Sequence, residues 1–233
     1  MKPTPDNFPT ASFHECADII KRIMPVPPFV VQIGAMDGVR FDLLHPHLIE
    51  GGWRGVLAEP LPDMFERLRE TYAEHPELTL ANCAIADYDG TLTLERIKPE
   101  IVASGLIREE ALGMASAFKD DRFRKEIIAS GHYPDAANDY VESVDVACLT
   151  LPHFLEQHGI TEIHVMMIDT EGADWMIARQ LDLDRFRPSL VCLEYHHLSG
   201  DDMRDCCAKF LKHGYQFALC QEDNENLLFY LGR

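Results

Sequence analysis

The sequence predicts an α/β fold, a doubly wound and mostly parallel sheet with an antiparallel hairpin at its carboxyl end. From Phe29 onward, short apolar runs alternate with longer stretches in which apolar residues recur at helical spacing. This alternation is typical of a parallel sheet with right-handed helical crossovers. The last two apolar runs, Tyr215–Leu219 and Asn226–Leu231, are separated only by Cys220–Glu225, so they predict a hairpin and an antiparallel edge of the sheet.

The first expected element is a helix at residues 12–24, which precedes the sheet. Apolar residues recur there at helical spacing, and three prolines end the pattern at Pro25, Pro27 and Pro28. The first half of the sheet then follows as alternating strands and helices. We expect strands at Phe29–Ile33, Gly55–Ala58 and Leu78–Asn82, and helices at Phe41–Ile49 and Pro62–Glu74.

The alternation is interrupted in the middle of the chain. A turn at Tyr88-Asp89-Gly90 leads into a short strand at Thr91–Leu94, and a second strand is expected at Val141–Ala147. The stretch between them, residues 99–140, is long for a connection in a compact domain. Such a segment is either disordered or covers a substrate, and we expect a lid.

The alternation resumes after this interruption. The expected helices are Leu151–His158, Ala173–Leu181 and Asp202–His213, and the expected strands are Ile163–Ile168 and Leu190–Tyr195. No internal repeat or low-complexity tract divides the chain. We therefore expect a single domain over residues 1–233.

The composition and net charge of the sequence limit the kinds of partner that the protein is expected to bind. The formal net charge is −18, which repels polyanions, so nucleic acid is not expected as a partner. No apolar run approaches the ~18 residues of a membrane span, and the first ten residues lack the pattern of a signal peptide. The seven cysteines form no C-x-x-C pair. We expect a cytoplasmic protein without a membrane partner, and we leave open whether it is a homo-oligomer.

The turn after the first strand indicates the ligand. In such sheets, ligands lie beyond the carboxyl ends of the strands, where this chain has Gly34-Ala35-Met36-Asp37-Gly38. The third glycine of a dinucleotide-binding turn is missing, and Asp37 would oppose a pyrophosphate. A carboxylate suits S-adenosylmethionine, which carries a sulfonium cation and an α-amino group. The alternative is that the two glycines serve packing only.

The ends of the second and third strands supply further candidates. Glu59 lies 25 residues beyond Gly34, where a carboxylate can accept hydrogen bonds from a ribose diol. The alternative is a solvated loop carboxylate. Asn82-Cys83-Ala84 and Asp87 follow the third strand and are candidates for the adenine edge, with capping of the strand end as the alternative.

The fourth and fifth strand ends carry acids and histidines. Asp169, Glu171 and Asp174 precede a helix, where they meet either a cation or the positive end of that helix. His196 and His197 follow the fifth strand. A histidine there can act as a general base near neutral pH, and we expect His196 in that role because neighbouring residues of an extended strand point to opposite faces.

Taken together, these strand ends resemble the FkbM family of methyltransferases. Members share a V-D-x-G-A-x-x-G first turn, an F-E-P second strand end, an N-x-A-x-x-D third and a K-I-D-x-E-G-x-E fourth. The corresponding segments here are residues 31–38, 58–60, 82–87 and 167–174. The resemblance spans Phe29 to about His197 and includes Gly113-Met114-Ala115-Ser116, which is similar to a serine-containing stretch of the family.

The resemblance implies a Rossmann-like class I methyltransferase fold and methyl transfer, usually to a hydroxyl of a sugar, polyketide or other small molecule. Gln32, Met167 and Asp174 depart from the family pattern, where an acid, a lysine and a glutamate are common. The first departure leaves Asp37 and Asp169 as the candidates for the cofactor's amino group.

The resulting hypothesis is a methyltransferase that uses S-adenosyl-L-methionine to O-methylate a small-molecule hydroxyl acceptor. The expected catalytic residues are His196 and Asp169. No metal ligand is assigned, and a metal ion bound by Asp169 and nearby carboxylates is the less favoured alternative. The alternatives are an NAD-dependent oxidoreductase and a cofactor-binding protein without turnover. The expected cofactor-binding residues are Gly34, Ala35, Asp37, Gly38, Glu59, Pro60, Asn82, Cys83, Ala84, Asp169 and Glu171.

Overall fold

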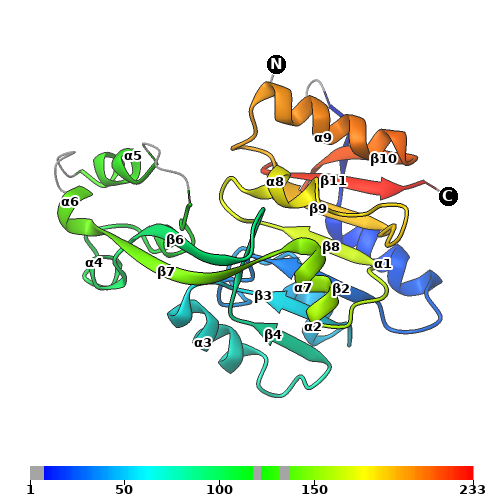
Figure 1. Ribbon diagram of the computed structural model, residues 1–233, viewed down its shortest axis with the longest axis horizontal. Helices are drawn as coiled ribbons and strands as arrows, with labels where there is room; N and C mark the ends of the chain where they lie inside the picture. Colours follow the sequence, from blue (N-terminus) through cyan, green and yellow to red (C-terminus); the bar gives the residue numbers. More distant parts are fainter. Residues whose placement is uncertain (1–7, 118–121, 132–136, 233) are drawn as a thin grey trace.

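A mixed eight-stranded sheet forms the centre of the computed structural model, which describes residues 8–117, 122–131 and 137–232 (Figure 1). Its strand order is β1-β10-β11-β9-β8-β2-β3-β4, and every neighbouring pair runs parallel except the two pairs made by β11. The strands are β1 (Thr10–Ala11), β2 (Phe29–Ile33), β3 (Arg54–Ala58), β4 (Leu78–Ala81), β8 (Val165–Ile168), β9 (Leu190–Glu194), β10 (Tyr215–Cys220) and β11 (Asn226–Leu231).

The predicted carboxyl-terminal hairpin is formed by β10 and β11. Its position differs from the antiparallel edge that we expected, because β11 pairs with β9 on its other side and so lies inside the sheet. The chain enters β10 parallel to β9 but one strand position away, and β11 fills the gap between them. This insertion brings the hairpin loop to the carboxyl end of β9.

Helices cover both faces of this sheet, which confirms the doubly wound prediction. Strand side chains alternate between faces, so Val31 and Ile33 pack on one side and Val30 packs on the other. One face is covered by α7 (Leu151–Gln157), α8 (Asp174–Ala178) and α9 (Gly200–Lys212), and the other by α1 (Phe13–Ile23), α2 (His45–Ile49) and α3 (Pro62–Thr71). Among the described residues, no helix has the length and apolar character needed to cross a lipid bilayer.

The helix expected at Phe41–Ile49 is shorter than predicted and begins at His45. Aspartates turn the chain before it. Asp37 accepts hydrogen bonds from the backbone N–H groups of Val39 and Arg40, and Asp42 accepts one from that of Leu44. Local side-chain bonds of this kind compete with helix formation, and they leave Phe41 with a φ of 57° and a side chain 69% exposed.

A second, three-stranded sheet forms an arm that extends beyond the main sheet (Figure 1). It consists of β5 (Ala84–Ala86), β6 (Gly90–Ile97) and β7 (Val141–Thr150), so β6 and β7 are longer than the strands predicted there. Leu61 and Met64 beside and within α3 pack into its core and anchor the arm to the main domain. The arm also carries α4 (Pro99–Ala103), η1 (Glu109–Leu112), α5 (Arg122–Ala129) and α6 (Ala137–Tyr140).

The segment expected as a lid, residues 99–140, belongs to this arm. Its residues 118–121 and 132–136 lie outside the described residues. Near its middle, Ser116 exchanges both backbone hydrogen bonds with Glu95 of β6, at 2.9 and 3.0 Å, which attaches the segment to the arm's sheet. A movement of this segment on ligand binding stays a prediction.

The carboxyl ends of β2 and β8 meet at Gly34. This residue has a φ of 84°, and a β-carbon built on it would lie 1.7 Å from the backbone oxygen of Asp169. The adjoining backbone is tied across three strands, because Gly34 and Ala35 donate to the Ala58 oxygen and Asp169 donates to the Ile33 oxygen, at 2.9 to 3.0 Å. Only glycine allows this approach.

We expect Gly34→Ala to destabilise the fold far more than Gly159→Ala. Gly159 follows α7 with a φ of 60° and nothing within 4 Å of an added β-carbon. Its replacement isolates the cost of a left-handed backbone, roughly 1–2 kcal/mol. The collision at Gly34 should raise the loss above about 4 kcal/mol. Urea unfolding measures both, and equal losses would show that β2 and β8 do not need this contact.

Candidate functional site

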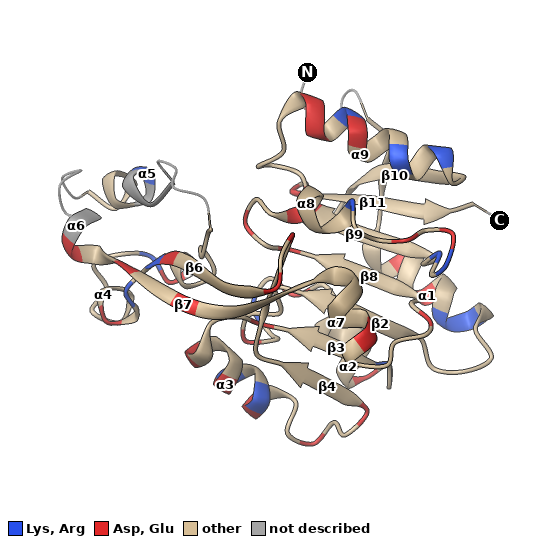
Figure 2. Ribbon diagram, viewed as in Figure 1, with Lys and Arg blue, Asp and Glu red and all other residues tan. Residues whose placement is uncertain are grey.

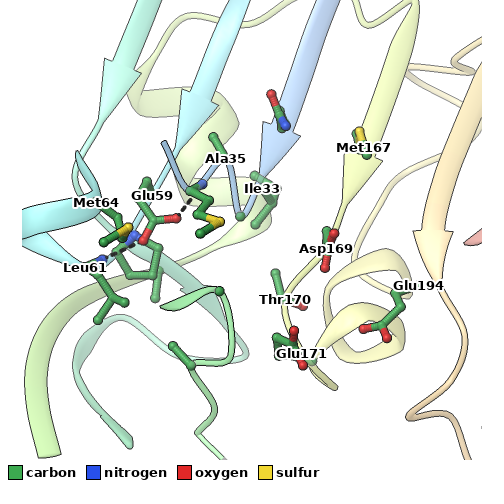
Figure 3. A pocket seen from close by; sticks show the side chains of 18 of the residues that line it. Ile33, Ala35, Glu59, Leu61, Met64, Met167, Asp169, Thr170, Glu171 and Glu194 are labelled. Atoms are coloured by element: carbon green, nitrogen blue, oxygen red, sulfur yellow. Dashed lines mark hydrogen bonds between the residues drawn. The ribbon is translucent and has the colours of Figure 1, made fainter. Parts of the chain in front are cut away.

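A cavity of about 1050 Å³ lies at the carboxyl edge of the main sheet, where its walls also include part of the arm. Figure 3 shows Glu59 on one side of it and Asp169, Glu171 and Glu194 on the opposite side. Eight of the expected cofactor-binding residues line it, namely Gly34, Ala35, Glu59, Pro60, Cys83, Ala84, Asp169 and Glu171. Of the remaining candidates, Asp37, Gly38, Asn82 and His196 are not part of the lining that the described residues form.

The turn after β2 divides its residues between the cavity and packing. Asp37 caps the turn through Val39 and Arg40, and its Oδ2 lies 3.5 Å from the Arg40 Nε. A β-carbon on Gly38 would lie 2.5 Å from the Tyr72 ring, so this second glycine serves helix packing. The structure therefore places Gly34 and Ala35 at the cavity, whereas Asp37 stabilises the turn and Gly38 packs against α3.

Glu59 is the buried carboxylate at the end of β3, with only 5% of its surface exposed. Its two oxygens accept backbone hydrogen bonds from Met36 and Leu61, each at 2.9 Å (Figure 3). Burial raises the pKa of Glu59 to about 7, although these two hydrogen bonds favour the charged form. Each carboxylate oxygen retains a second lone pair that can accept a ligand hydroxyl.

An apolar wall adjoins Glu59. Asn82 holds the loop there, because its amide donates to the backbone oxygens of Glu59 and Pro60 at 2.8 and 3.0 Å. Cys83 and Ala84, which follow Asn82, do line the cavity. The wall is completed by Leu61, Met64, Ile85, Ala86, Leu92 and Leu94, a surface that can hold a flat aromatic ring.

The opposite side of the cavity carries a concentration of acidic side chains. Burial raises the pKa of Asp169 well above its ordinary value, and the charges of Asp174 and Glu171 raise it further. Burial, followed by the charges of Asp169 and Glu171, raises the pKa of Glu194 to about 9. An environment that opposes ionisation to this degree favours a positively charged ligand.

Asp174 has a local role at the start of α8. Its Oδ2 accepts hydrogen bonds from the Thr170 hydroxyl and the Gly172 backbone N–H, each at 3.2 Å. Its side chain is fully buried and burial raises its pKa to about 6, but it does not reach the cavity. Asp174 therefore fits the alternative in which an acid lies at the positive end of a helix and does not meet a cationic ligand. Glu171, by contrast, adopts a φ of 55° in the same turn and lines the cavity.

The two histidines after β9 are placed opposite to our expectation. The strand ends at Glu194, and a turn closed by the Leu198 N–H and the Tyr195 oxygen follows at once. The alternation of an extended strand therefore does not apply to His196 and His197. Both rings are exposed, but His197 lines the cavity, with its Nε2 3.3 Å from Glu171 Oε2 and 3.4 Å from Glu194 Oε1, whereas His196 lies beside the Tyr195 ring.

Several cavity residues were not anticipated from the sequence. Glu222, Asp223 and Glu225 of the hairpin loop reach the cavity because β11 lies beside β9. Their only signal in the sequence was a cluster of acids between the last two strands. Gln32, which is buried, and Asp42 also line it. The arginines of the lining are Arg40 and Arg108, far fewer than its acids.

The charge of the whole ribbon shows the same imbalance (Figure 2). Lys and Arg gather mainly on α1, α3 and α9, away from the cavity, while Asp and Glu are spread over the loops and the arm. The surface thus offers little attraction to a polyanion.

Comparison with known proteins identifies the group to which this sequence is similar. A family model described as "Methyltransferase FkbM domain" matches residues 32–217. No curated protein matches the sequence.

Solved structures extend the comparison to the fold. A methyltransferase FkbM from Methylobacillus flagellatus KT is 12% identical, with a TM-score of 0.51, and the match covers 90% of this chain and 45% of that one. The METTL16 methyltransferase domain is 8% identical, with a TM-score of 0.50 and coverages of 94% and 66%. This chain is thus well short of the length of either structure. The fold they share is that of class I methyltransferases, as predicted.

Glu59 makes the stability of this fold depend on pH. Its pKa of about 7 exceeds the ordinary value of 4.5, so the folded state favours the protonated form, and stability falls as pH rises through this interval. Between pH 5 and pH 8, the parent should lose about 2–3 kcal/mol more than Glu59→Gln does. Urea unfolding at both pH values measures this difference. Identical pH dependence in the two proteins would mean that Glu59 is charged throughout.

Proposed function

This chain belongs to the FkbM family of methyltransferases, and we propose that it transfers a methyl group from S-adenosylmethionine to a hydroxyl group on a small molecule. The observation that carries this proposal is the division of one cavity into two parts. A buried carboxylate and an apolar wall lie at the ends of β3 and β5, and an acidic group lies at the ends of β8 and β9. These two parts suit the two ends of the cofactor.

The carboxyl groups and the apolar wall of the cavity fit S-adenosylmethionine. The lone pairs left on Glu59 can accept the ribose hydroxyls, and the wall that includes Cys83 and Ala84 can hold the adenine ring. Asp169, next to Gly34, suits the sulfonium and amino groups at the other end. A pyrophosphate would meet the same acids at an electrostatic cost, which argues against NAD and an oxidoreductase.

The chain's own residues contribute positioning and a route for one proton. The chemistry that bound S-adenosylmethionine supplies is an electrophilic methyl group, which the acceptor oxygen gains as the carbon–sulfur electron pair returns to sulfur and the hydroxyl proton leaves. Holding the acceptor close to that methyl group accounts for most of the expected acceleration. We place the acceptor oxygen beside Glu171, Glu194 and His197, so this group, rather than His196, promotes loss of the proton.

The kind of acceptor is inferred from the net charge of the protein and from the residues of the arm that line the cavity. The net charge of −18 and the acidic lining disfavour a polyanion such as nucleic acid. Arg108, Leu112, Gly113 and Met114 of the arm complete the cavity, so this segment sets acceptor specificity in our proposal. A binding protein without turnover remains the competing function. Release of S-adenosylhomocysteine in the presence of hydroxylated acceptors distinguishes the two.

Glu59→Ala should weaken binding of S-adenosylmethionine without unfolding the protein. Loss of a hydrogen-bond acceptor to a buried ligand is expected to cost ~1–3 kcal/mol, or about 5- to 150-fold in affinity. Glu50→Ala, at the exposed end of α2, provides the control and should bind like the parent. Calorimetric titration measures all three proteins. Equal affinity in Glu59→Ala and the parent would remove Glu59 from the ribose site.

His197→Ala should separate binding from chemistry. Cofactor affinity should stay within a few-fold of the parent because His197 lies at the acceptor side, whereas turnover should fall by ~10²–10⁴-fold. The adjacent His196→Ala provides a matched control and should retain near-parental turnover. The opposite ranking of the two variants would restore His196 as the residue that promotes proton loss, and equal turnover in all three proteins would exclude both.

A further inference from the structure

Three side chains at the acceptor side of the cavity have the spacing of a metal site. Glu171, Glu194 and His197 each present one ligand atom, and these atoms lie within 4.8 Å of one another. They come from the turn before α8, the end of β9 and the turn after it, so folding brings together residues 23 to 26 positions apart in the sequence, or three apart within one turn. All three line the cavity and are reachable from it.

An ordinary ion pair does not account well for this arrangement. The His197 Nε2 lies 3.3 Å from Glu171 and 3.4 Å from Glu194, beyond the ~2.7–2.9 Å of a charge-assisted hydrogen bond. A single N–H on Nε2 can serve both carboxylates only as a shared, weaker three-centre bond. In addition, Glu194 Oε2 is buried and has no hydrogen-bond partner among the described residues. A buried carboxyl oxygen in this state calls for a partner that the protein does not supply, either water or an ion.

The two distances from His197 agree with those around a small cation, and the two glutamate ligand atoms lie no more than 4.8 Å apart. Two ligands of a tetrahedral ion with bonds of about 2.0–2.1 Å are separated by about 3.3–3.4 Å, which is the spacing of His197 from each glutamate. Asp169, Asp223 and Glu225 line the same cavity and add negative charge around the position. Three protein ligands with an open side are typical of a catalytic metal site, in which water or substrate completes the coordination.

We propose that Glu171, Glu194 and His197 bind a divalent transition-metal ion. An imidazole with two carboxylates suits Zn²⁺ and Co²⁺ best and still accepts Mn²⁺, whereas Mg²⁺ and Ca²⁺ prefer oxygen ligands alone. The ion's catalytic role rests on the proposed function: an acceptor hydroxyl coordinated at the open position would lose its proton more readily. Binding of the ion itself does not depend on that function.

Titration with Mn²⁺ tests this site in the protein without cofactor. Mn²⁺ is the preferred probe because the seven free cysteines compete for Zn²⁺ but are poor ligands for Mn²⁺. The paramagnetic resonance signal of free Mn²⁺ reports binding, and excess Mg²⁺ occupies the oxygen-only sites of the acidic surface. We expect one bound Mn²⁺ per chain, with affinity lowered at least tenfold in Glu194→Gln and in His197→Ala.

Two controls keep the outcome decisive. His196→Ala should bind Mn²⁺ within twofold of the parent, because that ring is outside the group. Glu171→Gln, in a half-buried turn, provides a further ligand variant if Glu194→Gln fails to fold. The proposal is overturned if the parent shows no saturable binding above Mg²⁺ competition, or if the folded ligand variants all bind like the parent. Cofactor titration of the same samples tests the methyltransferase proposal separately, so one can fail while the other stands.

Discussion

The contact between Gly34 and the backbone oxygen of Asp169 is the constraint on which the rest of the site depends. It holds the carboxyl ends of β2 and β8 closer together than any side chain at position 34 would permit. The hydrogen bonds from Gly34 and Ala35 to Ala58 extend the same junction to β3. As a result, Glu59 at the end of β3 and Asp169 at the end of β8 face one cavity from opposite sides.

Charge then decides what this cavity can hold. Acids line it in excess of its two arginines, and burial together with their mutual repulsion raises the pKa of both Asp169 and Glu194. Removing water from such a group is costly unless positive charge enters with the ligand. A sulfonium cofactor at one position and a metal ion at another are two ways of meeting this requirement.

The fold, and several of the residues that line the cavity, could be predicted from the sequence, because the carboxyl ends of parallel strands can be recognised in it. Gly34, Glu59, Cys83 and Asp169 each follow a short apolar run directly, and each lines the cavity. The candidates that the cavity lining leaves out lie where local structure departs from that pattern. Asp37 caps its own turn, Asn82 ties down a loop, and the turn after Glu194 exchanges the places of His196 and His197. The acids of the hairpin loop were missed because the insertion of β11 beside β9 is a long-range pairing without a local signal.

A crystal structure of the complex with S-adenosylhomocysteine tests the central claim most directly. That claim is that Glu59 binds the ribose at one side of the cavity and Asp169 binds the amino-acid end at the other. We predict that the ribose hydroxyls lie within hydrogen-bond distance of Glu59 and that the amino-acid end lies beside Gly34 and Asp169. The side occupied by Glu171, Glu194 and His197 should stay open to the acceptor. A ligand bound outside this cavity, or bound within it with its ribose beside Asp169 and its adenine away from Cys83 and Ala84, would contradict the account.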